Sequence, residues 1–327
     1  MKILTVTNMY PSEARPNYGV FVKEQMEAVT RRCPDVEYDL YYIDNTHGNK
    51  AYLNSVFRIN RQISRGDYDI IHIHYGLSGL FMLWPLRRWN VPVVLTLHGG
   101  DIQPEQGKTV QVPLTRMILG RVDAAISLND RMQALASEKC RNVVKIACSV
   151  DTDIFCPAAD GSRRPADRNR KIRILFPSDP ARTVKNYPLF QAVVAELRAK
   201  YGLDAETANI MDMDRSQVAE AMRNADVLLM TSISEGSPQV VKEAMACNLP
   251  VVSTKVGDVD MLLEGVCRSA WSETADCGRL ADLVYVSAVK GFPAGMDGRE
   301  KIFRLGLDSD SVAMRIYNLY LSLIKKP

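Results

Sequence analysis

Short apolar runs alternate with stretches of helical periodicity along almost the whole chain. In the first half the runs predict six strands: Ile3–Thr7, Glu37–Ile43, Asp69–His74, Val91–His98, Ala124–Leu128 and Val143–Ile146. Between them, apolar residues at helical spacing predict five helices: Val20–Arg32, Leu53–Ser64, Leu77–Arg88, Leu114–Gly120 and Arg131–Ser137. Nearly continuous apolar runs are typical of parallel strands that are covered on both faces. This half is therefore predicted to form a doubly wound α/β sheet.

The second half repeats the alternation. Its predicted strands are Ile172–Phe176, Asp226–Met230 and Leu249–Ser253, and its predicted helices are Pro188–Lys200, Ser216–Asn224, Gln239–Cys247 and Cys277–Ser287. A polar, charged stretch rich in turn-forming residues, 158–171, separates the halves and reads as a linker. We therefore expect a first domain over residues 1–157 and a second over 170–308. Ligands of such sheets bind at the carboxyl ends of the strands, so candidate chemistry is sought there.

Composition excludes several classes of protein. The chain has 327 residues, 46% of them apolar, and a net charge of +3, which is too balanced for a dedicated nucleic-acid binder. No apolar run reaches the roughly 18–20 residues of a membrane span, and the first residues do not resemble a signal peptide. The seven cysteines are scattered and lack C-x-x-C spacing, which argues against a disulfide framework or a zinc site. A reducing compartment is the default for such cysteine usage, so we expect a cytoplasmic protein.

One segment combines a helix start with two carboxylates. After the strand Asp226–Met230, Ser237 is a good helix N-cap and Pro238 a good first helical residue. Gly236 would allow a ligand to approach the backbone, and a helix N-terminus attracts anions. Glu235 precedes this helix and Glu243 lies within it, so both could face one ligand. The alternative is that Glu235 is a loop charge and Glu243 a solvated helix residue.

In its context this segment resembles a known family. Glu235 and Glu243, separated by seven residues and continued by 244–254 and 256–259, resemble the E-x7-E motif of retaining GT-B glycosyltransferases of family 4. The resemblance implies two Rossmann-like domains with a cleft between them and a C-terminal helix, near 309–327, that returns to the first domain. It also implies transfer of a hexose from a nucleotide-diphosphate sugar to an acceptor hydroxyl with retained anomeric configuration, in polysaccharide or glycolipid biosynthesis.

Further segments match the same family in order. Phe176–Asn186 resembles its R-(few residues)-K element, Pro16–Phe21 its N-terminal glycine loop, 98–101 its H-G loop and Ser149–Pro157 its hinge. This chain has a single Gly19 where the family has a glycine pair. In addition, Met211, Asp212 and Met213 stand where the family has a glycine-rich turn, so no residue is assigned to the nucleotide base.

The resemblance assigns a role to each matching residue. It implies that Arg182 and Lys185 bind the diphosphate, where fixed cations stabilise the charge that develops as the glycosidic bond breaks. Glu243 would bind the ribose hydroxyls, and His98 and Asp101 would line the reaction centre. The backbone at Gly19 would approach the diphosphate. The sugar hydroxyls would be bound by the segment Glu235, Gly236, Ser237, Pro238 and Gln239.

No metal or resident cofactor is expected. His72 and His74 share one face of a strand, but no third ligand is suggested, and a structural role is the preferred interpretation. Several D-x-D pairs occur, among them Asp151/Asp153, Asp212/Asp214, Asp258/Asp260 and Asp308/Asp310, and their number favours chance over a metal site. The donor is expected to be a UDP-linked rather than a GDP-linked sugar, and the acceptor a sugar or a lipid-linked molecule.

A basic and aromatic stretch suggests a membrane-facing surface. Residues 83–90 contain Trp84, Arg87, Arg88 and Trp89, and a neighbouring helix carries further arginines at 58, 61 and 65. Such a combination favours an anionic lipid surface, so peripheral contact with the inner membrane face is expected. The alternative is a solvated helix end with buried tryptophans.

Two other functions remain open. One is a nucleotide-sugar 2-epimerase on the same fold, although nothing here resembles the C-terminal motifs of such enzymes. The other is a non-catalytic GT-B-like binding protein, which would be expected to lose the Arg182, Lys185 and glutamate set that this chain keeps.

Overall fold

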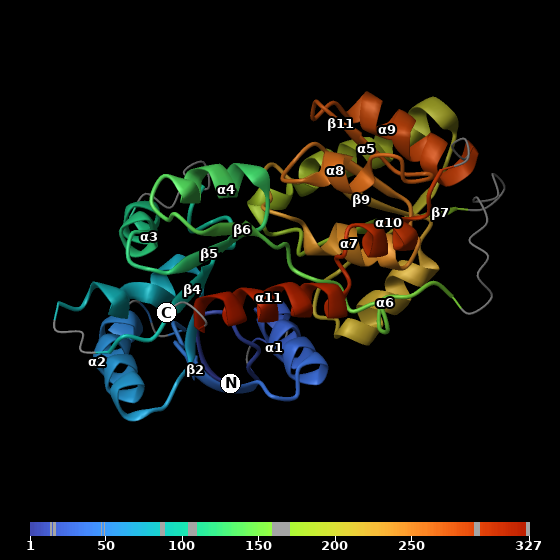
Figure 1. The fold of residues 1–327 in the computed structure, drawn as a ribbon. Coiled ribbons are helices and arrows are strands. Elements are labelled where there is room, and N and C mark those ends of the chain that lie inside the picture. Colours follow the sequence, from blue (N-terminus) through green and yellow to red (C-terminus); the bar gives the residue numbers. More distant parts are fainter. Residues whose placement is uncertain are drawn as a thin grey trace. The chain divides into compact units, whose positions relative to one another are not determined.

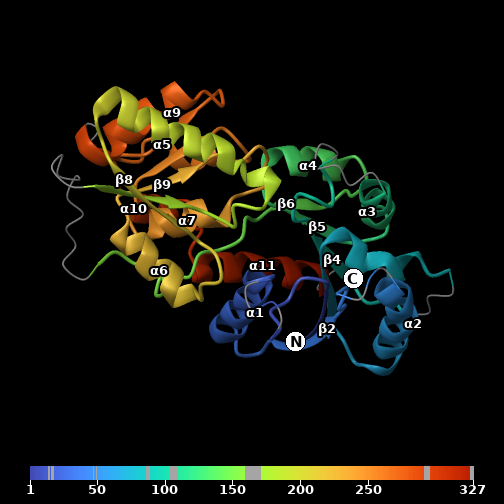
Figure 2. The ribbon, with the colours of Figure 1, turned by 180° about the vertical axis from the view of Figure 1, so that it is seen from behind.

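The protein consists of two compact α/β units (Figures 1 and 2). The computed structural model describes residues 1–13, 15, 18–46, 48, 50–85, 89–103, 110–158, 171–290 and 295–324. The first unit comprises Met1–Ser149 with Ser309–Pro327, and the second comprises Val150–Asp308. Most of the expected linker, 159–170, lies outside the described residues. No helix of the described part is long and apolar enough to cross a membrane.

The segment 150–157 belongs to the second unit, whereas we expected it in the first. The backbone N–H of Val150 donates to the carbonyl of Leu307 at 2.9 Å. Arg299 Nη1 donates to the carbonyl of Phe155, also at 2.9 Å, and the Phe155 side chain is fully buried. These contacts attach the segment to the end of the second unit.

The first unit contains a parallel six-stranded sheet in the order β2-β1-β3-β4-β5-β6. The strands are β1 (Lys2–Thr7), β2 (Glu37–Tyr42), β3 (Ile70–His74), β4 (Val93–Thr96), β5 (Ala124–Ser127) and β6 (Val143–Lys145). All six were predicted from the apolar runs, with ends that differ by at most a few residues. The chain reverses direction across the sheet between β1 and β3, which makes their carboxyl ends a topological switch point.

Helices cover both faces of this sheet because consecutive strand residues point to opposite sides. On one side Leu4 packs with α2 (Lys50–Arg65), the 3₁₀ segment η1 (Gly76–Leu83), α3 (Gln111–Leu119) and α4 (Asp130–Ser137). On the other side Ile3 packs with α1 (Val20–Arg32) and α11 (Ser309–Ile324). The predicted helix over 77–88 is instead η1, which ends at Leu83, and 86–88 lie outside the described residues.

His72 attaches α11 to the sheet. Its Nδ1 lies 2.6 Å from the Tyr320 hydroxyl of α11, and its Nε2 lies 2.7 Å from Thr96 Oγ1 of β4. The Tyr320 hydroxyl also lies 3.3 Å from that of Tyr38 on β2. Both ring nitrogens of His72 are thus used in the core of the unit, and the structural interpretation of this residue is confirmed.

The second unit contains a parallel five-stranded sheet in the order β11-β10-β9-β7-β8. Its strands are β7 (Ile172–Phe176), β8 (Ala205–Asn209), β9 (Val227–Met230), β10 (Val251–Thr254) and β11 (Ala270–Ser272). Its helices include α5 (Tyr187–Tyr201), α6 (Arg215–Asn224), α7 (Gln239–Ala246), α8 (Val259–Leu263), α9 (Cys277–Tyr285) and α10 (Gly298–Arg304). Here the switch point lies between β7 and β9.

The two edge strands of this sheet were not predicted. β8 has the sequence AETAN, and its three central residues are exposed, so it lacks the apolar run of a buried strand. β11 has only three residues. The central strands β7, β9 and β10, which position the candidate site, are largely buried and were predicted from their apolar runs.

Candidate active site

The loops after β7 and β9 are fastened together at the switch point of the second unit. The Thr231 hydroxyl lies 3.0 Å from the carbonyls of both Lys185 and Asn186. The backbone N–H of Ile233 donates to the carbonyl of Val184 at 2.8 Å. Lys185 is therefore held on a short 3₁₀ turn, Thr183–Lys185, directly beside the β9 loop.

Lys185 and Glu235 form the tightest charged pair of this edge. Lys185 Nζ lies 2.6 Å from Glu235 Oε1, and their side chains are only 10% and 17% exposed. The Ser232 hydroxyl donates to the same Glu235 oxygen at 2.7 Å. A charge-assisted pair in such a sheltered place is stronger and better oriented than a surface ion pair. The structure thus brings together two residues that the sequence assigned to adjacent parts of one ligand.

Arg182 lies three residues before Lys185 and is exposed. Its Nη1 lies 3.4 Å from the Ser178 hydroxyl, and its backbone N–H donates to the carbonyl of Asp179 at 3.1 Å. The loop therefore supplies one sheltered and one solvent-accessible cation at the carboxyl end of β7. Such a pair suits an anionic ligand that arrives from solvent.

Glu243 is held by Arg215, a residue that the sequence analysis missed. Arg215 Nη1 lies 2.7 Å from Glu243 Oε1, and the Glu243 side chain is 5% exposed. The Arg215 guanidinium also lies over the Phe155 ring, 4.5 Å from its centroid. Arg215 begins α6, directly after the stretch 211–213 that departs from the family pattern, so no motif marked it. Glu243 is consequently a sheltered, oriented carboxylate rather than a solvated helix residue.

The α7 N-terminus differs by one residue from the prediction. The helix begins at Gln239, and Pro238 is the capping residue, without a side-chain hydrogen bond to the helix. Ser237 is not the N-cap; its hydroxyl instead faces the Asp258 carboxyl. Gly236 approaches the turn after β10 closely, because a Cβ on Gly257 would lie 2.5 Å from its carbonyl oxygen.

Asp258 lies beneath this helix start. Burial raises the pKa of its carboxyl, while the Lys242 charge and the Ser237 hydroxyl act in the opposite direction. Asp258 is 7% exposed and Lys242 is fully buried. Asp258 therefore interacts electrostatically with a residue of α7, Lys242, and with Ser237 of the preceding loop.

In the first unit, Gly19 begins α1 in a left-handed conformation. Its φ is 70°, and a Cβ at this position would lie 2.3 Å from the carbonyl carbon of Met9. Only glycine permits this close approach of two backbone segments. Pro16 and Asn17, the start of the expected glycine loop, lie outside the described residues.

Asp101 ties two loops of the first unit together, and its catalytic assignment stays a prediction. One carboxylate oxygen accepts from the backbone N–H of Gly76 at 2.9 Å, and the other accepts from that of His98 at 3.0 Å. The side chain is completely buried. Asp101 thus ties the loop after β4 to the end of β3 and orients His98.

His98 is partly exposed and stacks in a row of three histidines. The centroid of its ring lies 5.5 Å from that of His74, and the His74 centroid lies 4.3 Å from that of His72. The Phe21 ring packs against His98, with the two centroids 5.0 Å apart. His98 Nε2 lies 3.3 Å from His74 Nδ1. Desolvation lowers the pKa of His98 to about 3, so its imidazole is neutral at ordinary pH. It can give or take a hydrogen bond, but it supplies no charge.

These buried histidines predict a loss of stability in mild acid. Desolvation, with a smaller effect of His98, lowers the pKa of His72 from 6.5 to about 3, and His74 shifts in the same direction. The unfolded chain therefore binds more protons below pH 6.5, and stability falls from there towards pH 3. At pH 5 we expect His72 alone to cost about 2 kcal/mol relative to pH 7.

Urea unfolding between pH 7 and pH 5 measures this effect. The His72→Gln variant should be less stable at pH 7 but should show a smaller pH slope, by about one proton. Equal slopes in the parent and the variant would contradict the assignment.

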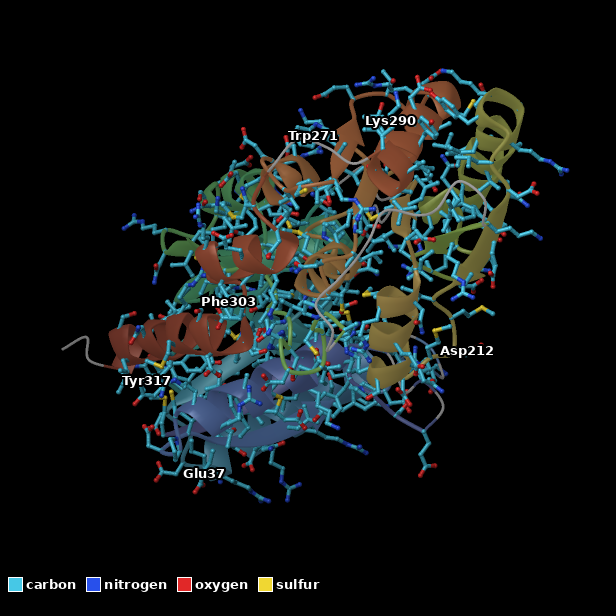
Figure 3. All side chains as sticks on the ribbon, turned by 90° about the vertical axis from the view of Figure 1, so that its right-hand side faces the viewer. Glu37, Asp212, Trp271, Lys290, Phe303 and Tyr317 are labelled. Carbon is cyan, nitrogen blue, oxygen red and sulfur yellow. The ribbon has the colours of Figure 1, made fainter. Side chains whose placement is uncertain are left out.

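Several aspartates of these pairs have local structural roles. Asp151 Oδ1 accepts from the backbone N–H of Asp153, and Asp214 caps α6. Asp260 lies in the first turn of α8 and Asp310 in that of α11. Asp212 lies in the exposed loop before α6 (Figure 3). Within the described ranges, no group of three or more His, Cys, Asp or Glu residues is placed to hold a metal ion.

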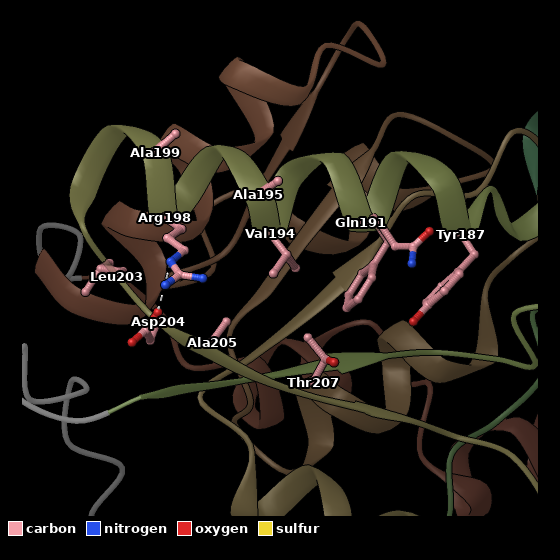
Figure 4. A pocket seen from close by; sticks show the side chains of 11 residues that line it. Tyr187, Gln191, Val194, Ala195, Arg198, Ala199, Leu203, Asp204, Ala205 and Thr207 are labelled. Atoms are coloured by element: carbon pink, nitrogen blue, oxygen red, sulfur yellow. Dashed lines mark ion pairs between the residues drawn. The ribbon is translucent and has the colours of Figure 1, made fainter.

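A cavity of about 560 Å³ lies away from these residues. It is a groove between α5 and the edge strand β8, and Arg198 and Asp204 form a 3.4 Å ion pair across one end of it (Figure 4). Lining residues include Tyr187, Phe190 and Thr207, and none of the predicted site residues takes part. The candidate site is thus the edge formed by the strand ends and not this groove.

Known proteins match both units. The family model for a glycosyl transferase 4-like domain matches residues 5–147, and that for glycosyl transferases group 1 matches residues 185–285. A D-inositol 3-phosphate glycosyltransferase of Kribbella flavida is 27% identical over 63% of this chain. The match spans 60% of that relative's length.

Solved structures share the fold. Sucrose-phosphate synthase of Thermosynechococcus elongatus matches with a TM-score of 0.78 and 17% identity, over 98% of both chains. HepE of Anabaena, solved in complex with UDP-glucose, matches with a TM-score of 0.69 and 14% identity, over 99% of this chain and 100% of that chain. The two parallel α/β units are those of the GT-B fold. With both family models matched in order along the chain, the protein belongs to the family 4 glycosyltransferases of the GT-B type.

Proposed function

We propose that this protein is a retaining glycosyltransferase that moves a hexose from a nucleotide-diphosphate sugar to an acceptor hydroxyl. The observation that carries the proposal is the Lys185–Glu235 pair at the switch point of the second unit, with exposed Arg182 on the same loop and the start of α7 beside it. A cation and a helix start can bind a phosphate, and the carboxylate between them can accept hydrogen bonds from sugar hydroxyls. The arrangement therefore suits a ligand that joins a phosphate to a sugar.

Each residue has a task in this reaction. Arg182 and Lys185 neutralise the diphosphate as the bond from the anomeric carbon to the phosphate oxygen breaks, and the leaving group keeps the electron pair. Glu243, oriented by Arg215, accepts hydrogen bonds from the ribose hydroxyls. Glu235 and residues 236–239 hold the sugar hydroxyls. Neutral His98 contributes a hydrogen bond near the reacting sugar, and Asp101 orients it.

The identity of the donor and acceptor is also a proposal. A UDP-linked donor is favoured, since HepE was solved with UDP-glucose and another fold neighbour is a UDP-forming trehalose-phosphate synthase of Burkholderia vietnamiensis. The acceptor is proposed to be a sugar or a lipid-linked molecule. A sugar phosphate or a polyol phosphate would supply the acceptor hydroxyl in the first case. Relatives named for D-inositol 3-phosphate support a phosphorylated polyol as the first candidate to test.

Sugar-labelled UDP-, GDP- and ADP-hexoses, each offered with these acceptors, test the proposal. We expect label to appear in an acceptor product whose anomeric configuration equals that of the donor. Conversion of the donor to its 2-epimer without acceptor would instead identify an isomerase. Donor binding without any turnover across the panel would identify a non-catalytic binding protein.

Turnover is further expected to need no divalent metal. Arg182, Lys185 and the start of α7 already supply the positive charge that a metal would give the diphosphate. Activity of a metal-stripped sample in excess EDTA should therefore stay within about twofold of the untreated rate. Near-complete loss that Mn²⁺ or Mg²⁺ restores would overturn this charge-compensation argument.

A further inference from the structure

The exposed face of α2 carries two large apolar side chains. Leu53 and Phe57 are 69% and 63% exposed. They are four residues apart, so they lie one turn apart on the same face of the helix. The side that faces the core is a different one, formed by Tyr52, Ile59 and Ile63, which are buried. Leu53 and Phe57 therefore contribute nothing to the apolar core, and their exposure needs another explanation.

Trp84 extends this apolar surface. The Phe57 and Trp84 rings meet edge to face, with their centroids 4.6 Å apart, and Trp84 is partly exposed. Trp89 is also partly exposed but is held by other contacts. Its indole N–H donates to Asn60 Oδ1 at 2.9 Å, and its ring packs near Phe81. Arg87 and Arg88, which were expected here too, lie outside the described residues.

Cations border the apolar residues on the same helix. Lys50, Arg58, Arg61 and Arg65 are exposed, and Phe57 and Arg61 are one turn apart. The helix contains no acidic residue. Among the residues that the structure describes, none of the three arginines forms an ion pair with a carboxylate. Arg58 contacts the Tyr41 hydroxyl, which is a neutral partner and leaves its charge uncompensated.

We propose that this face, the α2 patch, docks on an anionic lipid surface. The patch consists of Leu53, Phe57, Trp84, Lys50, Arg58, Arg61 and Arg65. Cations attract the charged headgroups, while adjacent leucine, phenylalanine and tryptophan side chains enter the headgroup boundary. A free polyanion such as RNA would use the arginines but would leave Leu53 and Phe57 without a partner. The combination therefore favours a membrane.

Flotation with vesicles tests the proposal. The protein should float with vesicles of phosphatidylglycerol and phosphatidylcholine but not with phosphatidylcholine alone. The triple variant R58Q/R61Q/R65Q should bind about 100-fold more weakly, because each cation near an anionic surface contributes roughly a factor of five. The variant L53S/F57S should also bind more weakly, and most clearly at high salt, where electrostatic attraction is screened.

Matched controls lie on the second unit. R173Q/R198Q/R304Q removes the same number of charges from other exposed positions, and F303S removes an exposed aromatic side chain from α10. Both should float like the parent, and all variants should keep its melting temperature. The assay contains no donor or acceptor, so its outcome is independent of the proposed transfer reaction.

Three results would overturn the proposal. The first is equal flotation of all variants, or no flotation with anionic vesicles. The second is self-association of the parent that L53S/F57S abolishes without any vesicle binding, which would make the patch an interface between copies. The third is RNA binding that depends on the arginines while vesicles are ignored.

Discussion

Replacing Lys185 with alanine should lower kcat/KM for the donor about 100-fold. Lys185 is only 10% exposed in its side chain and is aligned by the β9 loop, so water cannot easily take its place at a phosphate. One charge-assisted hydrogen bond is worth about 1.5–3 kcal/mol, and 1.4 kcal/mol corresponds to a factor of ten. Steady-state kinetics with the donor that the labelled-hexose panel identifies would measure the loss. Arg182→Ala should have the same direction and a smaller size, because Arg182 is exposed.

The Glu235 partner allows the binding role of Lys185 to be separated from a role in folding. Lys185→Ala leaves the Glu235 carboxylate without its cation, which should cost about 1–3 kcal/mol of stability. Adding Glu235→Gln should restore part of the melting temperature but none of the activity.

Lys200→Ala is the matched control for this prediction. It breaks a lysine–aspartate pair of the same 2.6 Å length at an exposed place, and it should leave kinetics unchanged. Recovery of activity in the double variant would reduce Lys185 to a structural residue.

Replacing Arg215 with alanine should raise KM for the donor about tenfold, with a smaller change in kcat. Arg215 orients the Glu243 carboxylate from 2.7 Å, and contacts to a ribose act alike in the ground state and the transition state. Glu243→Gln should show the same split. Because both act through one contact, the double variant should be little worse than either single variant.

Two further variants make this prediction specific. Arg215→Lys should restore part of the affinity, and Arg198→Ala, at an exposed arginine of α5, should have no effect.

Glu235→Gln is expected to act mainly on kcat, because its carboxylate would lie nearer the breaking bond. The opposite pattern, with kcat lowered by Glu243→Gln and KM raised by Glu235→Gln, would exchange the two roles.

The central part of the fold was predictable because buried parallel strands leave continuous apolar runs. β7, β9 and β10 were found in this way, and with them the loops that carry Lys185 and Glu235. β8 was missed because an exposed edge strand such as AETAN carries no such run. Segment 150–157 was misplaced because its attachment depends on one backbone and one side-chain hydrogen bond from residues more than 140 positions away, which leave no local pattern.

The candidate site was predictable only where a motif marks the residue. Glu235 and Glu243 are recognisable by their spacing, but Arg215, which orients Glu243, belongs to no motif. For Asp101 the motif gave no sign of the contacts that its side chain makes. A carboxylate after an H-G-G sequence reads as reactive, yet its two oxygens satisfy the backbone N–H groups of Gly76 and His98. Spacing along the chain does not tell which way a side chain turns.

Calorimetric titration of nucleoside diphosphates tests the central claim most directly. The account predicts that UDP binds the parent protein at one site per chain. It also predicts that Lys185→Ala weakens UDP binding at least about tenfold, by the loss of one charge-assisted hydrogen bond, and leaves the weaker binding of uridine unchanged. If UDP, GDP and ADP all fail to bind, or if UDP binds the Lys185→Ala variant as tightly as the parent, the phosphate site is not where this account places it.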